Sequence, residues 1–296
     1  MKKKIVMLLT VTMICAGVTA CGSTKGSSNA EGGSVAIEDD ETPQAEDADS
    51  TSITSGEGLS AADVSKPEDF DHILMQDGTV AVTGYNGEAS VVIVPEEIEG
   101  AKVTSVNGFH MKDSIVRIEL PDSITRIEDG AFEADINLEE VIIGPNVEYI
   151  GKYAFDRDKA LKSINIPASV TEIGHEAFRM CAFEEVTIPD GITKLSRSVF
   201  ALSLNLKNIT IPGNVKTIGK QAFEGCESLE SVVIEEGVES IGENVFAHSD
   251  NLSRVEIPAS VTQIDCKLNS DCTVVAPEGS YAETYAKERG YNFVAK

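Results

Sequence analysis

Few side chains in this sequence have the types and spacing that enzymes use. His175-Glu176 begins like the zinc-binding pattern His-Glu-x-x-His, but Arg179 occupies the fifth position, where the second histidine ligand is required. The acidic run Asp156-Arg157-Asp158 lacks the glycine-containing loop that encloses a calcium ion. The sequence also has no phosphate-binding glycine loop and no serine in a nucleophile elbow. We therefore predict a protein that is not an enzyme and that holds no metal and no cofactor.

The cysteines are the other reactive side chains, and their spacing indicates structural roles. Cys181 and Cys226 hold the same position of a repeated segment, two repeats apart. Stacked strands would place them about 10 Å apart, beyond the limit of about 7 Å between the Cα atoms of a disulfide. We predict that both are buried free thiols. Cys266 and Cys272 either form a disulfide in an oxidising compartment or stay free, and no histidine shares their spacing to complete a zinc site.

The N-terminus has the pattern of an export signal. Three lysines at positions 2 to 4 precede an apolar run from Ile5 to Ala16, which is too short for an ordinary membrane span. The run ends in Val18-Thr19-Ala20-Cys21, which looks like a lipobox, where bacterial lipoproteins are cleaved and acylated. We predict a signal peptide at 1–20 and a lipid anchor on Cys21, with two acyl chains and an N-linked one, palmitate among the candidates. The alternative is an ordinary signal peptide with an incidental cysteine.

The segment that follows is acidic and almost free of large apolar residues. Between positions 22 and 69 it has twelve acidic residues and two lysines, a net charge of −10. This composition predicts a disordered tether at 21–66, with a root-mean-square reach of about 37 Å. The whole chain carries a formal net charge of −25, which disfavours nucleic acid and anionic lipid as partners and favours basic surfaces. The same charge could also serve solubility alone.

Beyond the tether, one pattern recurs with a period of 23 residues. It is clearest from Leu161 to Cys181: Leu-x-x-Ile-x-Ile-Pro-x-x-Val-x-x-Ile-Gly-x-x-Ala-Phe-x-x-Cys. One spacing, from Leu161 to Phe183, is 22 residues. A period in this range is typical of a solenoid, in which each repeat forms one coil. The first apolar positions of the successive copies are Ile115, Leu138, Leu161, Phe183, Leu206, Leu229 and Leu252.

Each copy changes its hydrophobic period partway through. Alternating pairs such as Ile164 and Ile166 predict a short strand that proline usually ends. Ile173, Ala177, Phe178 and Cys181 then recur at helical spacing. The sequence thus predicts an α/β-type solenoid of about seven coils at 115–272, each with a short strand, a bend and a short helical turn. The strands would pair into one parallel sheet.

Segments such as IPASVTEIGHEAFRMC and IPGNVKTIGKQAFEGC resemble the BspA-like leucine-rich repeats of bacterial surface proteins. The resemblance covers about residues 80 to 296. It implies a leucine-rich-repeat superhelix, a role in adhesion or recognition at the cell surface, and no chemistry of its own. Departures are modest: Gly144 and Glu235 replace the proline, and Val199 and Val245 replace the alanine before phenylalanine.

The two ends of the repeat region have the patterns of caps. In an N-terminal cap at 67–114, Asp77-Gly78 and Asn86-Gly87 are hairpin-turn signals, followed by a degenerate coil at about 91–114. In a C-terminal cap at 273–296, a strand precedes a helix that opens at the capping box Ser280-x-x-Glu283 and stops at Gly290, with a last strand after it. Caps cover the apolar faces of the terminal coils.

The strand positions between the buried pairs form two columns on the outer face of the predicted sheet. We predict that this face binds a protein or glycan at the cell surface, on the extracytoplasmic side of a bacterial membrane, with the membrane contacted only through the lipid. The function would be adhesion by a monomer; an envelope scaffold for the organism's own wall or secreted proteins and an accessory subunit of a glycan-processing enzyme are the alternatives. The columns are Arg117, Glu140, Ser163, Glu185, Asn208, Ser231 and Arg254, and Glu119, Ile142, Asn165, Thr187, Thr210, Val233 and Glu256.

Overall fold

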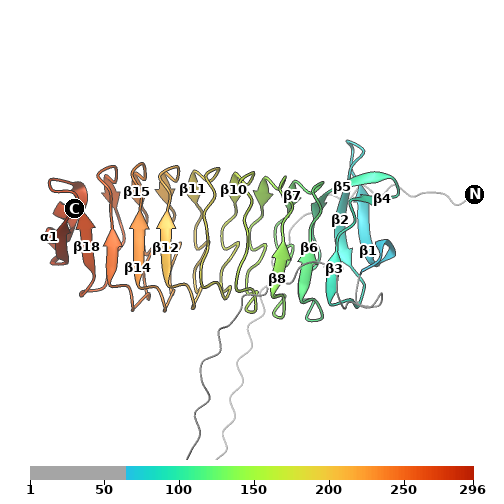
Figure 1. The fold of residues 1–296 in the computed structure, drawn as a ribbon, viewed down its shortest axis with the longest axis horizontal. Helices are drawn as coiled ribbons and strands as arrows, with labels where there is room; N and C mark the ends of the chain where they lie inside the picture. Colours follow the sequence, from blue (N-terminus) through green and yellow to red (C-terminus); the bar gives the residue numbers. More distant parts are fainter. Residues whose placement is uncertain (1–64) are drawn as a thin grey trace, which may run out of the picture. The chain divides into compact units, whose positions relative to one another are not determined.

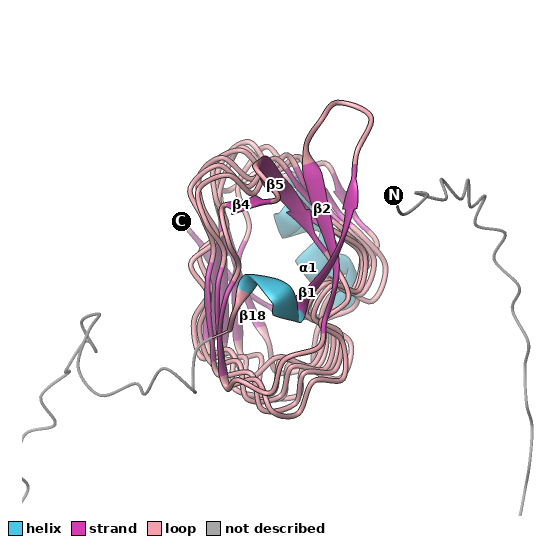
Figure 2. Ribbon diagram, turned by 90° about the vertical axis from the view of Figure 1, so that its right-hand side faces the viewer, coloured by secondary structure: helices cyan, strands magenta, loops and turns pink. Residues whose placement is uncertain are grey.

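The computed structural model describes residues 65–296, which form an elongated stack of coils with a helix at one end (Figure 1). Viewed along the stack, each coil is an oval ring, with strands on two opposite sides (Figure 2). Apolar side chains fill the ring, and one continuous core runs from Phe70 to Ala286. This confirms the predicted solenoid.

One side of the ring, which we call the sheet face, carries parallel strands that each come from a different coil. Paired strands of the regular coils are one repeat apart in the sequence, as stacking of equivalent segments requires, and this spacing changes only where the caps begin. They are β3 (Val91–Ile93), β6 (Arg117–Glu119), β8 (Glu140–Ile142), β12 (Asn208–Ile211), β14 (Ser231–Ile234), β16 (Arg254–Glu256), β18 (Thr273–Ala276) and β19 (Asn292–Ala295).

The opposite side of the ring carries a second set of parallel strands, mostly two residues long, which we call the back face. The predicted bend between the strand and the turn forms these short strands, so the coil pairs with its neighbours twice. They are β5 (Ala101–Val106), β7 (Arg126–Ile127), β9 (Tyr149–Ile150), β10 (Glu172–Ile173), β11 (Lys194–Leu195), β13 (Thr217–Ile218), β15 (Ser240–Ile241) and β17 (Gln263–Ile264).

The segments predicted as short helical turns are not α-helical. Two residues of each such segment adopt left-handed backbone angles, for example Glu176 (φ 59°) and Met180 (φ 62°), and these interrupt a helix every four residues. The amides bond between coils instead: Phe155 donates to Ala177 O at 2.8 Å, and Phe178 donates to Val199 O at 3.0 Å. Among residues 65–296 the one α-helix is α1 (Tyr281–Arg289), near the C-terminus.

A stack of phenylalanine rings runs along this turn side of the core. Each ring is buried, and each comes from the Ala-Phe or Val-Phe pair of one coil except that of Phe109, which follows Gly108. Consecutive ring centroids are 5.1 to 6.1 Å apart, and most pairs are nearly parallel. Such contacts add to the burial of the rings themselves. The rings belong to Phe109, Phe132, Phe155, Phe178, Phe200, Phe223 and Phe246.

The caps agree with the predicted architecture, with one exception. β1 (Phe70–Leu74) and β2 (Val80–Tyr85) form an antiparallel hairpin around Asp77-Gly78, after a short 3-10 helix at Pro67–Asp69. Asn86-Gly87 is not a hairpin turn, because the chain crosses there to β3, which pairs in parallel with β6. β4 (Glu97–Ile98) forms a small antiparallel pair with β5.

The C-terminal cap has the predicted order of strand, helix and strand. Ser280 caps α1 by accepting a hydrogen bond from the Glu283 amide at 3.2 Å, and Gly290 ends the helix in a left-handed conformation. β19 then adds to the sheet face beside β18. The cap therefore seals the core and lengthens the sheet face in the same few residues.

A buried polar position recurs directly after the second left-handed residue of each turn segment, where the residue is cysteine, serine or aspartate. Its hydroxyl or thiol donates to the carbonyl of the preceding coil's phenylalanine: Cys181 Sγ to Phe155 O at 3.2 Å, and Ser249 Oγ to Phe223 O at 2.9 Å. Ser249 Oγ also accepts from the amide of Cys226 at 3.2 Å. Ser249 thus satisfies two backbone groups of the preceding coil, whereas Ser203 Oγ, at the same position, has no hydrogen-bond partner among the described residues. The residues at this position are Asp135, Asp158, Cys181, Ser203, Cys226 and Ser249.

Two coils carry an aspartate at this position, and burial keeps it protonated. The Asp158 carboxylate accepts from the amide of Asp135 at 2.9 Å, and Asp135 accepts from the amide of Lys112 at 2.7 Å. Burial raises the pKa of Asp158 to about 9, with the charge of Asp135 as a second cause. Burial likewise raises the pKa of Asp135 to about 8. The second oxygen of each carboxyl has no hydrogen-bond partner among the described residues, so ionisation there is unfavourable.

Replacing Asp158 by serine should therefore stabilise the fold at neutral pH. The folded protein holds a proton on Asp158 that the unfolded chain releases near pH 4, so wild-type stability falls as pH rises from about 4 towards 9. Serine accepts and donates the same bonds in the coil of Ser249 without that penalty. We expect Asp158→Ser to raise the free energy of unfolding at pH 7 by about 2 kcal/mol, and by less at pH 4.

Urea unfolding at both pH values measures this difference. Asp250→Ser, at an exposed aspartate of another coil, is the control and should change stability little. Equal stability of Asp158→Ser and wild type at pH 7, with the same pH dependence, would show that the buried carboxyl does not behave as a neutral acid.

Candidate functional site

The structure brings the predicted columns together in register on most of the sheet face. Arg117 pairs with Glu140, and Glu119 with Ile142, between β6 and β8. Asn208, Ser231 and Arg254 align across β12, β14 and β16, as do Thr210, Val233 and Glu256. All fourteen predicted residues are exposed or half-buried, so the side chains are accessible along the face.

The columns extend further than the sequence predicted. Val91 and Ile93 of β3 precede Arg117 and Glu119, and the columns continue beyond β16 through β18 and β19. The repeat pattern is too degenerate at both ends to place these residues. Short alternating runs such as Thr273 to Ala276 were the only signal for them. The added members at the C-terminal end are Thr273, Val275, Asn292 and Val294. Of the added residues at the two ends, Val91 and Val275 are buried.

Ion pairs within the protein neutralise the acidic residues at both ends of the columns. Arg117 contacts Glu119 at 2.6 Å and Glu140 at 3.2 Å. At the other end, Glu256 receives Arg254 at 2.7 Å and Lys296 at 2.9 Å. Hydrogen bonds from Lys296 and then Arg254 lower the pKa of Glu256. The charged groups at these ends are therefore already partnered.

The middle of the sheet face departs from the single sheet that the repeats predicted. One sheet consists of β3, β6 and β8, and another of β12, β14, β16, β18 and β19. Residues 163–166 and 185–188 lie between the two sheets without strand pairing. On the back face the ladder also stops between β10 and β11. Ser163, Asn165, Glu185 and Thr187 are thus on the face but outside its ladders. We call this region the central gap.

The 22-residue repeat accounts for part of the central gap. In the other coils the next apolar anchor comes three positions after the buried polar residue, as Leu229 does after Cys226. In this coil Phe183 comes only two positions after Cys181. The connection into residues 184–188 is shorter, and a larger side chain fills the leucine position, so this segment misses the register of its neighbours. The phenylalanine stack still crosses the gap, with 5.6 Å between the rings of Phe178 and Phe200. No feature of the sequence explains why residues 163–166 leave β8.

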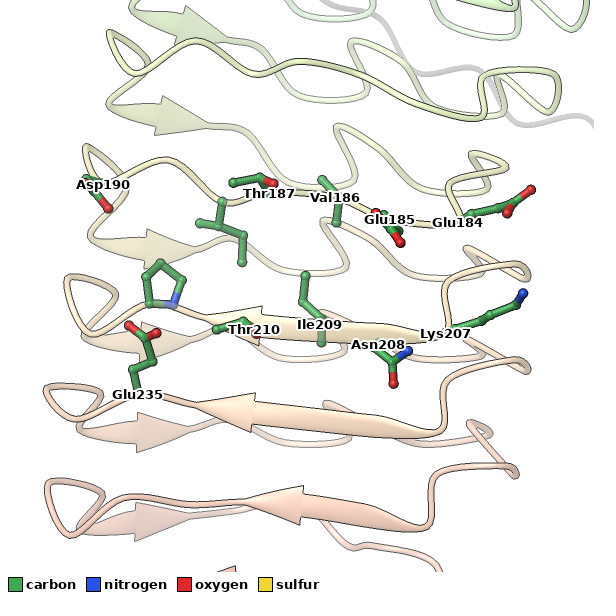
Figure 3. A pocket seen from close by; sticks show the side chains of 12 residues that line it. Glu184, Glu185, Val186, Thr187, Asp190, Lys207, Asn208, Ile209, Thr210 and Glu235 are labelled. Atoms are coloured by element: carbon green, nitrogen blue, oxygen red, sulfur yellow. The ribbon is translucent and has the colours of Figure 1, made fainter. Parts of the chain in front are cut away.

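A groove of about 540 Å³ lies in the central gap, between residues 184–190 and 207–212. Val186, Ile188 and Ile209 form its apolar lining. Asp190 and Glu235 lie at one end of the groove, and Glu184 and Lys207 at the other (Figure 3). We call it the central groove. Sequence reasoning placed only residues 185, 187, 208 and 210 on this face and did not find the groove, because a uniform ladder has no gap.

The edge of β12 that faces the central groove has no strand partner. In the next two coils the equivalent amides point to the preceding coil: Ser231 donates to Lys207 O at 3.4 Å, and Arg254 to Glu230 O at 3.3 Å. Along a strand of a parallel ladder, the amides of alternate residues point to the same side. From the register of β12 with β14, the amides of Asn208 and Thr210 therefore face residues 184–188. Within the described chain, no backbone hydrogen bond joins 184–188 to 207–211.

The reactive side chains of the described region are separated or buried. Cys181, Cys226, Cys266 and Cys272 are all buried free thiols, so Cys266 and Cys272 are not bridged. Burial raises the pKa of Cys226 and of Cys266 to about 12, which keeps both thiols protonated. Between residues 65 and 296, no three His, Cys, Asp or Glu side chains gather in a way that could hold a metal ion. In that same region no helix has the length and hydrophobicity to cross a membrane. Cys21 and the acidic tether lie outside the described residues.

Comparison with known proteins agrees with this architecture. The family model of the BspA type leucine rich repeat region matches in six copies, over residues 102–159 and 148–275. The chain belongs to this family. BspA-type repeats suggest a protein-binding or recognition role, and the leucine-rich-repeat fold is typically non-catalytic.

Two solved structures extend the comparison. A leucine-rich repeat protein from Bacteroides ovatus ATCC 8483 is similar at 25% identity with a TM-score of 0.50, over 70% of this chain and 70% of that chain. The T. pallidum leucine rich repeat protein TpLRR is similar at 22% identity with a TM-score of 0.51, over 78% of this chain and 99% of that chain. The second likeness shows the fold alone. No curated protein matches the chain.

Hydrogen exchange should reveal the central gap in solution. The amides of Asn208 and Thr210 face the gap, whereas Ser231 and Val233, at the same positions of the next coil, lie inside a ladder. We expect the first pair to exchange faster, on the order of a hundredfold, because open backbone groups need no unfolding event to meet water.

Nuclear magnetic resonance at residue level would measure these rates. The four sites form two pairs, Asn208 with Ser231 and Thr210 with Val233, and the two residues of each pair share one strand position. Equal protection of all four amides would show that the sheet face is continuous.

Proposed function

We propose that this chain is a lipid-anchored recognition protein that binds a protein or glycan at the bacterial cell surface through the sheet face. The observation that carries the proposal is the array of aligned, accessible side chains along this face. The array spans ten strand positions, from β3 to β19 with two unpaired segments between, or about 43 Å at the usual strand spacing.

The array suits binding because its backbone is fixed before a partner arrives. Inter-coil bonds hold the column positions outside the central gap, so little backbone freedom is lost on binding. Most column side chains are short or β-branched, and such side chains have few rotamers to lose on binding. The repeat family supports this role, since leucine-rich-repeat proteins generally bind protein partners.

The anchor and the tether belong to the same proposal. Lipidation of Cys21 would hold the protein on the outer side of the membrane, and residues 21–66 would separate the repeats from it. Residues 22–69 contribute −10 and residues 70–296 about −18 to the net charge of the exported chain. This charge favours a partner with a basic surface.

A bulky group attached to the sheet face should abolish binding. The chain from residue 21, with Cys21→Ser to omit the lipid, would be tested by biolayer interferometry against matrix proteins, mucin glycans and bacterial wall fractions. Asn165→Cys adds one exposed thiol to the sheet face, to which a polyethylene glycol maleimide can be coupled. The four native thiols are buried and should not react.

The matched control is Thr171→Cys carrying the same polymer, because Thr171 is exposed and precedes β10 on the back face. Saturable binding to a host component that is lost only on blocking Asn165→Cys is the expected result. Loss in both labelled variants, or in neither, would remove the sheet face from the proposal. Saturable binding to wall fractions alone would replace adhesion with the scaffold role, and no saturable binding to any panel member would contradict recognition.

A further inference from the structure

We infer that the central groove binds an extended, lysine- or arginine-bearing segment of a partner protein, which pairs with the free edge of β12. This inference rests on the proposed function and names the part of the sheet face that receives the partner. Three features of the groove support it: an unpaired strand edge, unpaired carboxylates and an apolar lining.

The strand edge supplies the backbone contacts. An unpaired edge presents amides and carbonyls that an extended peptide can join, as in strand addition. β12 is four residues long, which gives about 13 Å of edge. Only side-chain packing holds residues 184–188 against it, because no backbone bond crosses between the two segments of the described chain. Widening the groove to admit a strand therefore breaks no ladder bond of the sheet face, while the pairing of β11 with β13 keeps the two coils joined on the back face.

The carboxylates determine the charge of the segment. Glu184, Glu185 and Asp190 have neither an ion pair nor a side-chain hydrogen bond within residues 65–296. Glu235 accepts a weak bond from the Gly213 amide at 3.3 Å, and Lys207 is the one basic residue of the lining. The ends of the face differ, because arginine and lysine there already neutralise the acids. The groove thus has four carboxylates against one lysine, and a basic partner would supply the missing positive charge.

The apolar lining suits the alternation of an extended chain. When every second side chain faces outward to the carboxylates, the others face the groove. Val186, Ile188 and Ile209 would contact those inward side chains, which are best small and apolar. A volume of about 540 Å³ is within the usual range of binding pockets.

Charge also excludes the occupants that this chain could itself provide. The segment from 22 to 69 carries −10 and would be repelled by the carboxylates of the groove. A second copy presents a body of about −18 over residues 70–296. The occupant is therefore a segment of a different, basic protein.

A defined peptide tests the inference on the chain from residue 21 with Cys21→Ser. The probe is the fluorescein-labelled heptapeptide Lys-Val-Lys-Thr-Lys-Val-Lys, measured by fluorescence anisotropy at physiological salt. We expect saturable binding, and no binding of the peptide with glutamate in place of lysine. Binding of both peptides, or of neither, would overturn the inference.

Neutralising the groove isolates the role of its carboxylates. The combined variant Glu184→Gln, Glu185→Gln, Asp190→Asn should weaken binding of the heptapeptide at least about fivefold, as expected for the loss of a few exposed ion pairs. The control Glu148→Gln, Glu172→Gln, Glu239→Gln removes the same charge from exposed positions at the back face. An equal loss in both variants would mean that the peptide senses only net charge, and the inference would fail.

Two further measurements test the pairing with β12. A heptapeptide N-methylated at alternate residues on its pairing edge cannot donate to the strand, and we expect it to lose binding. The amides of Asn208 and Thr210 should gain protection from exchange when the unmodified peptide binds. Unchanged affinity after methylation, in both possible alternations, or unchanged exchange would overturn strand addition.

Restoring the missing residue provides a variant in which the groove should close. A serine inserted between Ala182 and Phe183, together with Phe183→Leu, gives this coil the spacing of its neighbours. The regular variant should fold, protect the amides of Asn208 and Thr210, and lose the peptide. If it shows that protection and still binds the peptide, the groove is not the site. If the peptide tests fail, the proposed function still holds as long as binding to the host and wall components depends on the sheet face.

Discussion

Hydrogen bonding from each coil to the next is the interaction on which the rest of this structure depends. It operates on the sheet face, on the back face and also along the turns, where amides such as that of Phe178 donate to the following coil. The left-handed residues of the turns orient these amides, and most of the buried serine, cysteine and aspartate side chains bond to backbone groups of the preceding coil. Apolar packing fills the rings, and the ladders fix how the rings align.

Dependence on register also explains how a small change in sequence can create a site. In a globular core, a missing loop residue is usually absorbed locally. In a stack, each coil is aligned only by its neighbours, so the short connection between Cys181 and Phe183 affects the strand beside it. The outcome is a local opening in an otherwise closed surface, flanked by carboxylates that have no ion pair within residues 65–296. The regular coils form a rigid frame, and the irregular coil creates the groove that distinguishes the middle of this face from its ends.

The sequence predicted those features that repeat with the period. The inward pairs, the column positions, the hairpin at Asp77-Gly78 and the capping box of α1 follow from local patterns, and the structure contains them. The sequence led to a wrong prediction where one spacing fits two structures. Ile173, Ala177, Phe178 and Cys181 have the spacing of a helix face, yet non-helical turns place their side chains in the core. The central gap could not be predicted, because the 22-residue spacing was visible but its effect on pairing depends on packing in three dimensions. The pairing of Arg117 with both Glu119 and Glu140 likewise needed coordinates.

The phenylalanine stack has a mechanical consequence. In the proposed surface role, flow would pull the chain from its ends, and coils in series would all bear the same force. The junction between the coils that begin at Leu161 and Phe183 lacks both strand ladders, and turn-side bonds such as that from Phe178 to Val199 carry most of its backbone contact. The rings of Phe178 and Phe200 remain stacked across it. Under tension this junction would yield first, opening about the aromatic side as a pivot and widening the strand faces opposite.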